Sequence, residues 1–331
     1  LPLFTIEDAH RALTLLRGVD FDEAIQLSGR STARLHPSGH ILGAGMVSIE
    51  SAGRRILFSG DLGRPNDPLM RPPASIESAD TLVLESTYGD RRHAERDPEQ
   101  ELEAHLSRAL GRGGVVIIPA FAVGRVQTLL HLLARLKASG KLGSVPVYLN
   151  SPMAVDATRI YHTYRRQHRL TFEECEAACR VAEFVNSPDA SKELNERKGP
   201  MIIVAASGMA TGGRVVHHLK AFAPDPKNMV LFSGFQAGGT RGAAMVAGAE
   251  YVRIHGQDIP VRAEVANLET LSAHADYVEI LDWLRGFKRA PQTTYLTHGE
   301  PQASDQLRQR IERTLGWDCY VPDYREVVST P

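Results

Sequence analysis

Short apolar runs rich in β-branched residues alternate along the chain with longer segments in which apolar residues recur every three or four positions. The clearest helical pattern is Val126, Leu129, Leu130, Leu133 and Leu136, which fall on one face of a helix. The apolar runs predict strands at 46–50, 55–59, 81–85, 115–119, 145–150, 201–205, 229–233, 251–254, 261–268, 293–297 and 318–321. The amphipathic segments predict helices at 6–16, 98–112, 123–139, 154–167, 171–181, 214–222, 241–247, 277–287 and 304–315. Such alternation is typical of an α/β fold in which helices cover a sheet.

The order of these elements predicts two domains, one inserted into the other. The strands at 46–50 and 55–59, joined by a short turn, indicate an antiparallel hairpin. The region from about 90 to 250 repeats strand and helix, as a doubly wound unit does. Acid–base and metal-binding side chains gather on both sides of that region, at 40–85 and 272–300. We therefore expect an inserted domain within a domain whose active site is split along the sequence.

Composition limits the classes of partner. The net charge is -1 over 331 residues, so no overall field attracts a polyanion or a membrane, and a nucleic acid must be held by a local patch. Three cysteines without C-x-x-C spacing argue against a disulfide framework and favour a reducing cytoplasm. No apolar run approaches the ~18 residues of a membrane span, and the first residues lack the basic start and apolar core of a signal peptide.

Three residues are candidate metal ligands. Asp61 follows the strand-like run at 56–59, His298 follows the run at 293–297, and His40 lies among glycines at 38–45. Carboxylate and imidazole suit zinc, and a bridging carboxylate can hold two metal ions. Each residue alone has an ordinary alternative, such as an aspartate stabilising its own turn or a polar loop histidine. Their occurrence together at strand ends in one α/β chain favours a metal site.

Glu85 and His274 are a candidate acid–base pair. Glu85 ends an apolar run, and burying an unpaired carboxylate there is costly. His274 precedes the predicted helix at 277–287. A carboxylate bonded to one imidazole nitrogen fixes the tautomer and raises the pKa, so that the other nitrogen can protonate a leaving alkoxide. The alternative is two unrelated polar residues.

Two glycine-rich loops and one arginine are candidate phosphate contacts. The loop at 207–214, with Ser207, Gly208 and Arg214, follows a predicted strand and opens a helix, and the loop at 233–241 has the same arrangement. Arg125 lies at another helix start. Backbone N–H groups at a helix N-terminus can hold phosphate, although tight turns alone also explain such glycines. Neither loop is a P-loop, because the Gly-Lys-Ser/Thr ending is absent.

Seven motifs occur in a fixed order: Gly39-His-Ile-Leu-Gly-Ala44, Ser59-Gly-Asp61, Glu85-Ser-Thr-Tyr-Gly89, Pro119-Ala-Phe-Ala-Val-Gly-Arg125, Ala206-Ser-Gly-Met209, Ser272-Ala-His-Ala-Asp276 and His298-Gly-Glu300. In this order they resemble the β-CASP branch of the metallo-β-lactamase-fold nucleases. That branch includes the endonuclease subunit of the pre-mRNA cleavage and polyadenylation machinery and its bacterial and archaeal RNase relatives. The resemblance implies an α/β fold with a partial metallo-β-lactamase αββα sandwich at 1–89 and 261–331. It also implies an inserted doubly wound β-CASP domain at 90–260 that closes over RNA.

The resemblance also implies roles for the candidate residues. His40 would bind zinc, Asp61 would bridge two zinc ions and take part in catalysis, and His298 would bind the second zinc. Glu85 would orient His274, which would protonate the leaving oxygen. The implied contacts to RNA or phosphate are Arg125, Ser207, Gly208, Arg214 and Ser272. The implied reaction is zinc-dependent hydrolysis of single-stranded RNA by a cytoplasmic endoribonuclease, with an added 5′ exonuclease mode left open.

One departure from the family pattern bears on activity. The signature His-x-His-x-Asp-His, which supplies most zinc ligands in the family, does not occur in these 331 residues. We expect an N-terminally truncated chain that binds zinc weakly, cleaves poorly and exposes apolar sandwich surface through which it forms homodimers. Two alternatives stay open: a catalytically silent protein that binds RNA or acts as a scaffold, and a DNA-directed nuclease of the same superfamily.

Overall fold

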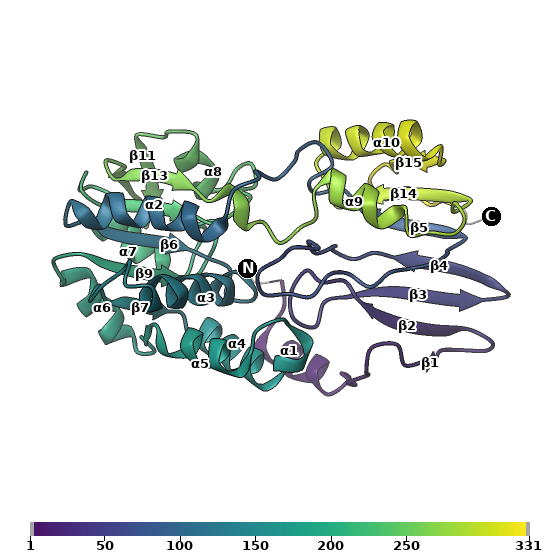
Figure 1. Ribbon diagram of the computed structural model, residues 1–331, viewed down its shortest axis with the longest axis horizontal. Helices are drawn as coiled ribbons and strands as arrows, with labels where there is room; N and C mark the ends of the chain where they lie inside the picture. The colour runs from purple at the N-terminus through teal and green to yellow at the C-terminus, as the bar shows by residue number, and fades with distance from the viewer. Residues whose placement is uncertain (1–2, 329–331) are drawn as a thin grey trace.

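Two main sheets form the computed structural model, which describes residues 3–328 (Figure 1). The first sheet has seven strands in the order β1-β2-β3-β4-β5-β14-β15. Neighbouring strands from β1 to β4 pair antiparallel, and those from β4 to β15 pair parallel. The predicted hairpin is present as β3 and β4. The strands are β1 (Ile25–Gln26), β2 (Thr32–Pro37), β3 (Gly45–Ser51), β4 (Arg54–Phe58), β5 (Thr81–Glu85), β14 (Thr293–Thr297) and β15 (Cys319–Tyr320).

One face of this sheet packs against helices α9 (Tyr277–Leu284) and α10 (Pro301–Leu315). Alternate strand residues supply the core there because successive side chains in a strand point to opposite faces. Leu57 in β4 and Leu84 in β5 are fully buried in this core. On the opposite face, Ile56 is half-buried and Phe58 is 40% exposed, so part of that face is open apolar surface.

The second sheet has six strands in the order β13-β10-β6-β9-β7-β8, and every neighbouring pair is parallel. Its central strands are continuously apolar and buried because helices cover both faces. The strands are β6 (Val115–Pro119), β7 (Val147–Asn150), β8 (Glu183–Phe184), β9 (Met201–Ala205), β10 (Met229–Phe232) and β13 (Glu264–Asn267).

Helices α2 to α5 pack on one face of the second sheet, and α6 to α8 pack on the other. Their bounds are α2 (Pro98–Gly111), α3 (Arg125–Ala138), α4 (Pro152–Thr163), α5 (Phe172–Arg180), α6 (Pro188–Glu196), α7 (Val215–Phe222) and α8 (Arg241–Val246). The remaining elements are α1 (Ile6–Leu13), the 3₁₀ turns η1 (Arg165–Gln167) and η2 (Glu269–Leu271), and the hairpin of β11 (Tyr251–Ile254) and β12 (Gln257–Pro260). The predicted α/β class with a doubly wound insertion is therefore confirmed.

The insertion leaves the first sheet after β5 and returns before β14, as the split of polar residues along the sequence predicts. The domain limits at 89 and 260 stay predictions. The strand β13 lies beyond the second limit, yet it pairs with β10 in the inserted sheet. Across the described range, none of the helices has the length and apolar character that crossing a bilayer requires.

Candidate active site

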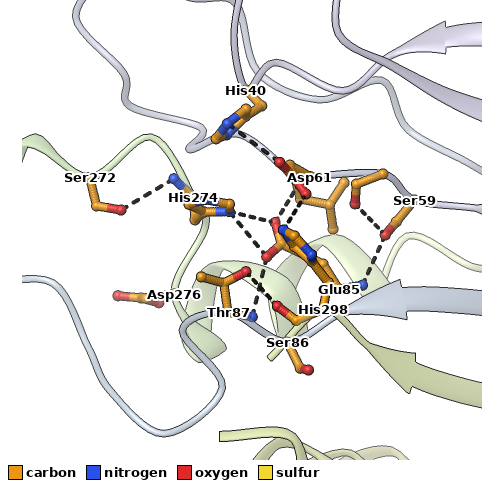
Figure 2. Close-up of polar contacts among 12 residues, drawn as sticks. His40, Ser59, Asp61, Glu85, Ser86, Thr87, Ser272, His274, Asp276 and His298 are labelled. Atoms are coloured by element: carbon orange, nitrogen blue, oxygen red, sulfur yellow. Dashed lines mark hydrogen bonds and ion pairs between the residues drawn. The ribbon is translucent and has the colours of Figure 1, made fainter. Parts of the chain in front are cut away.

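Three parallel strands of the first sheet place polar side chains at one edge. In the order β4, β5 and β14, the strands end just before Asp61, at Glu85 and just before His298. The carboxyl ends of neighbouring parallel strands meet at the same edge of a sheet, where ligands commonly bind. Figure 2 shows these three residues close together with His40 and His274, which come from loops.

Asp61 lies between two imidazoles. Its Oδ2 is 3.6 Å from Nε2 of His40, and its Oδ1 is 3.3 Å from Nε2 of His298. The His40 and His274 rings are adjacent, with centroids 4.4 Å apart. The predicted ligands His40, Asp61 and His298 therefore meet at one point, although His298 is the most exposed of them, at 62% of its side chain.

Backbone contacts fix the loops that carry these residues. Gly39 forms a β-bridge with Leu62, and Gly63 forms another with His274. The Gly63 N–H also donates to the Ser38 carbonyl at 2.8 Å. A Cβ on Gly63 would lie 2.0 Å from the Gly39 carbonyl oxygen, so only glycine permits this approach. The loops bearing His40, Asp61 and His274 are thus joined through their main chains.

Glu85 is buried, and both of its carboxylate oxygens have hydrogen-bond partners. Its Oε1 accepts from the Leu62 N–H at 2.6 Å, and Nδ1 of His274 lies 3.2 Å from each of its carboxylate oxygens. Burial by itself raises the pKa of this carboxyl. The hydrogen bond and charge of His274, together with a hydrogen bond from Thr87, outweigh burial and bring the pKa below the ordinary value. Glu85 is therefore ionised and holds the His274 ring in one orientation.

His274 has the complementary environment. Burial lowers its pKa, but the hydrogen bond and charge of Glu85 outweigh burial and raise the pKa above the ordinary value. Its backbone N–H donates to Ser272 Oγ at 3.3 Å, which places the predicted residue Ser272 beside it. Because Nδ1 faces Glu85, Nε2 is the nitrogen left for a substrate.

His40 and His274, together with Arg125 and Ser272, line one cavity of about 440 Å³. Arg125 is half-buried there, and its guanidinium makes no hydrogen bond or ion pair within residues 3–328. Burial lowers its pKa to about 10, so it stays charged at neutral pH. A half-buried cation without a partner is the kind of group that binds an anion.

The other predicted phosphate contacts lie elsewhere. Arg214 NH1 donates to Asn150 Oδ1 at 2.7 Å and to the Val185 carbonyl at 2.8 Å, and its NH2 donates to the Asn186 carbonyl at 2.6 Å. Ser207 Oγ lies 3.1 Å from Thr211 Oγ1 and accepts from the Thr211 N–H. Gly208 packs closely against Phe121. Ser207, Gly208 and Arg214 are therefore not among the residues that line the cavity with His274, although Gly208 contacts Phe121, which does line it.

Sequence reasoning did not single out His93, which holds the backbone of the His274 loop in place. Its Nε2 donates to the His274 carbonyl at 2.9 Å, and its backbone N–H donates to Asp276 at 2.8 Å. Burial lowers the pKa of His93 to about 4, so the ring is neutral. Asp276 also caps helix α9 by accepting from the Val278 and Glu279 N–H groups. An Asp directly before a predicted helix is a signal that sequence alone offers for that cap, whereas nothing in the sequence marks His93.

The residues present fit a metal such as zinc. Ligand atoms of His40, Asp61 and His274 lie within 4.8 Å of one another, and His298 adds a second imidazole to Asp61. Within residues 3–328, Nδ1 of His40 is buried without a hydrogen bond of ordinary geometry. Burial, followed by the charge of His274, lowers the pKa of this imidazole despite a backbone contact with Ala273, which keeps the ring neutral. Neutral imidazole and carboxylate are the donors that zinc takes.

Comparison with known proteins gives two family matches. The family model of the Beta-Casp domain matches residues 126–245. That of the Zn-dependent metallo-hydrolase RNA specificity domain matches residues 258–322.

Relatives cover most of the chain. Ribonuclease TTHA0252 of Thermus thermophilus is 39% identical over 91% of this chain and 70% of its own length. An RNase J-like protein of Methanocaldococcus jannaschii is 32% identical over 96% of this chain and 75% of its own. Transcription termination factor FttA of Pyrococcus abyssi is 31% identical over 99% of this chain and 53% of its own. A crystal structure of a protein of unknown function from Enterococcus faecalis shares the fold, with TM-score 0.50 and 12% identity over 93% of this chain and 66% of that one.

Proposed function

The chain belongs to the β-CASP family of metallo-β-lactamase-fold ribonucleases, and on that basis we propose that it hydrolyses phosphodiester bonds in single-stranded RNA with a bound zinc ion. The observation that carries the proposal is one cavity that His274 and Arg125 share, next to Asp61 and its two imidazoles. Relatives named as ribonucleases support RNA as the substrate.

His40, Asp61 and His298 are the residues that would hold zinc, and a zinc ion supplies Lewis acidity at a phosphoryl oxygen. The expected number of two ions per complete site stays a prediction. The sequence contains no His-x-His-x-Asp-His, so the 331-residue chain offers few ligands for two ions, and we expect it to bind zinc weakly.

The proposed proton donor is His274. Its raised pKa favours the protonated ring, and its Nε2 is free of Glu85. Protonating the leaving oxygen of the broken P–O bond removes the cost of expelling an alkoxide. Glu85 acts by stabilising the charged imidazolium and by fixing which nitrogen faces the cavity.

The proposed contact to the phosphate is Arg125. Its guanidinium lies in the cavity with His274 and makes no hydrogen bond within the described residues. A phosphate supplies the charge and the acceptor oxygens that such a group lacks. Ser272 lines the same cavity, although its hydroxyl already accepts from the His274 backbone.

Endonucleolytic cleavage in RNA processing or decay, in the cytoplasm, is the form of the activity we propose. A second candidate is a silent RNA-binding protein, which the absence of the histidine motif favours for these 331 residues taken by themselves. A protein that only binds RNA does not need the Glu85–His274 pair beside Asp61, and this pair favours hydrolysis. Formation of homodimers through exposed apolar surface stays a prediction, which light scattering at several protein concentrations tests.

The experiment measures zinc per chain and cleavage of an end-labelled single-stranded RNA, on the 331-residue chain and on the longest polypeptide that its gene encodes. We expect zinc-dependent cleavage in at least one form, with internal products visible at the earliest times. The same sequence as single-stranded DNA is the control for substrate class. No zinc and no cleavage in either form contradicts the proposal and leaves RNA binding as the alternative.

A further inference from the structure

A second cavity, of about 450 Å³, adjoins the one that holds His274. Gly234 and Phe235 line both cavities, so a ligand chain leaving the first passes Phe235 to enter the second. We call the second cavity the Phe235 cavity. Its lining also includes Tyr88, Arg91 and Asn267. The roles proposed for His274, for Arg125 and for the metal ligands do not involve this cavity.

The aromatic rings here are linked to the site. The Tyr88 ring stacks with His274 at a centroid distance of 6.3 Å, and it meets Phe235 edge-on, also at 6.3 Å. Phe235 is half-buried, whereas Tyr88 is buried. A flat group bound in the Phe235 cavity would therefore lie near the ring of His274, the proposed proton donor.

Arg91 extends this set of flat surfaces. Its guanidinium carbon lies 5.3 Å from the Tyr88 ring centroid and 5.5 Å from that of Phe235. Its Nε and NH2 donate to the two carboxylate oxygens of Asp90, at 2.7 and 3.0 Å, which fixes the plane of the guanidinium. An arginine held in this way presents a π-surface on which a nucleobase can stack.

Charge separates the two cavities. Arg91 is paired with Asp90, and Arg92, which also lines the Phe235 cavity, is paired with Glu95. Both cations are thus neutralised by a neighbouring carboxylate, which leaves little net attraction for phosphate. Within residues 3–328, Arg125 in the first cavity makes no ion pair of this kind, and only the charge of the more distant Asp67 acts on it among the carboxylates. Flat surfaces without a free cation, in a cavity that the carboxylate of Glu269 also lines, adjoin the guanidinium of Arg125. This arrangement matches a nucleotide, whose base is flat and uncharged and whose phosphate is charged.

We propose that the Phe235 cavity binds the base of a nucleotide adjacent to the scissile phosphate, stacked on Phe235 and Arg91. This rests on the proposed function, because the phosphate is placed by Arg125. Asn267, whose Oδ1 accepts from the Gly234 N–H at 3.2 Å, lines the cavity with an amide that can meet the edge of the base. Stacking tolerates every base, so the site selects for an unpaired strand rather than for a sequence.

The test uses two fluorescein-labelled ligands and the 331-residue chain, with binding followed by fluorescence anisotropy. One ligand is a ten-nucleotide oligouridylate, and the other is the same ribose-phosphate chain without bases. Phe235→Ala should weaken binding of the oligouridylate by about fivefold or more and leave binding of the abasic chain unchanged. Phe235→Tyr keeps the ring and should bind like the original protein. Arg125→Ala should weaken both ligands alike.

Other outcomes overturn the proposal in distinguishable ways. Equal loss for both ligands in Phe235→Ala or Arg91→Ala would mean that the cavity holds backbone phosphate. No loss in Phe235→Ala, with an unchanged thermal unfolding curve, would remove the base site and leave the proposed function intact. If the original chain binds neither ligand, RNA binding itself fails, and the base site fails with it.

Discussion

Nδ1 of His274 lies 3.2 Å from both carboxylate oxygens of Glu85, a residue 189 positions earlier in the chain. The whole inserted domain lies between them in sequence. The β-bridge of Gly63 with His274 and the bond from the Leu62 N–H to Glu85 hold both residues against the same loop. The pair is therefore positioned mainly by the first sheet and its loops, and His93 of the insertion adds a hydrogen bond to the His274 carbonyl.

Replacing His274 with alanine should lower RNA cleavage about 10²-fold or more, because His274 is the proposed proton donor to the leaving oxygen. The measurement is single-turnover cleavage of a labelled single-stranded RNA, on whichever form of the protein cleaves. Zinc content should be retained, since His40, Asp61 and His298 remain. Undiminished cleavage, or loss of cleavage only in proportion to loss of zinc, would remove His274 from proton transfer.

The coupling between Glu85 and His274 should depend on pH. The lowered pKa of Glu85 gives stability that is present above its ordinary value of 4.5 and is lost as the pH falls through the folded-state pKa below it. The raised pKa of His274 gives stability that is present below 6.5 and is lost as the pH rises through the folded-state value above it. Their coupling is therefore largest between these two limits.

A double-mutant cycle with Glu85→Gln and His274→Gln measures this coupling from urea unfolding at several pH values. We expect about 1–3 kcal/mol near pH 5.5 and a smaller value at pH 8.5. The matched control is the exposed pair of Arg285 and Asp282, whose coupling should be small at every pH. A coupling that is flat from pH 4 to 9 would contradict the assigned pKa directions.

The sequence could predict those elements whose signal is local. The strands predicted at 81–85 and 293–297 match β5 and β14 at both ends, because each is a short run of β-branched, aromatic and leucine residues bounded by polar residues. The helix α6 was missed, although Ser187 caps it and Pro188 opens it, both of which are ordinary start signals.

Elements that depend on tertiary contacts were predicted wrongly. The strand predicted at 261–268 is shorter in the structure, because β13 begins only at Glu264 and ends at Asn267. The N–H groups of Arg262 and Ala263 both donate to the Ala223 carbonyl, outside any sheet. The helix predicted at 154–167 ends at Thr163 and continues as η1. No local sequence pattern predicts these tertiary contacts or these element ends.

The same distinction applies to the site. Strand ends indicated Asp61, Glu85 and His298 because parallel strands of one sheet bring their ends together. Arg214 and Arg125 look alike in sequence, since each lies at a helix start after a glycine. They differ only in their surroundings: Arg214 meets Asn150 from β7, whereas Arg125 meets the cavity. That difference exists only in the folded chain.

The two arginines should therefore respond differently to substitution. Arg125→Ala should weaken binding of a single-stranded oligonucleotide and lower the slope of log affinity against log salt by about 0.7, the value for one phosphate contact. Arg214→Ala should leave that slope unchanged but lower the free energy of unfolding by roughly 1–3 kcal/mol, because it breaks three internal hydrogen bonds. Anisotropy titrations at several salt concentrations and urea unfolding measure both. A changed salt slope in Arg214→Ala would show that Arg214 contacts the nucleic acid after all.

Gly63→Ala should separate the loops that form the metal site. The added Cβ would lie 2.0 Å from the Gly39 carbonyl oxygen and 2.6 Å from the His40 backbone nitrogen, and neither backbone atom can rotate away as a side chain could. Moving them shifts His40 relative to Asp61 and strains the bridge to His274. We expect a loss of roughly 1–3 kcal/mol in the free energy of unfolding and weaker zinc binding.

The matched substitution is Gly111→Ala, at the exposed end of α2, where a Cβ meets nothing within 4 Å. It should stabilise the chain by about 0.5–1 kcal/mol, since alanine loses less conformational freedom than glycine in a helix, and it should leave zinc affinity unchanged. Urea unfolding and a competitive zinc titration compare the two variants. Equal zinc affinity in Gly63→Ala and Gly111→Ala would mean that the 39–63 contact does not hold the ligands, and that Asp61 and His40 are positioned by their own loops.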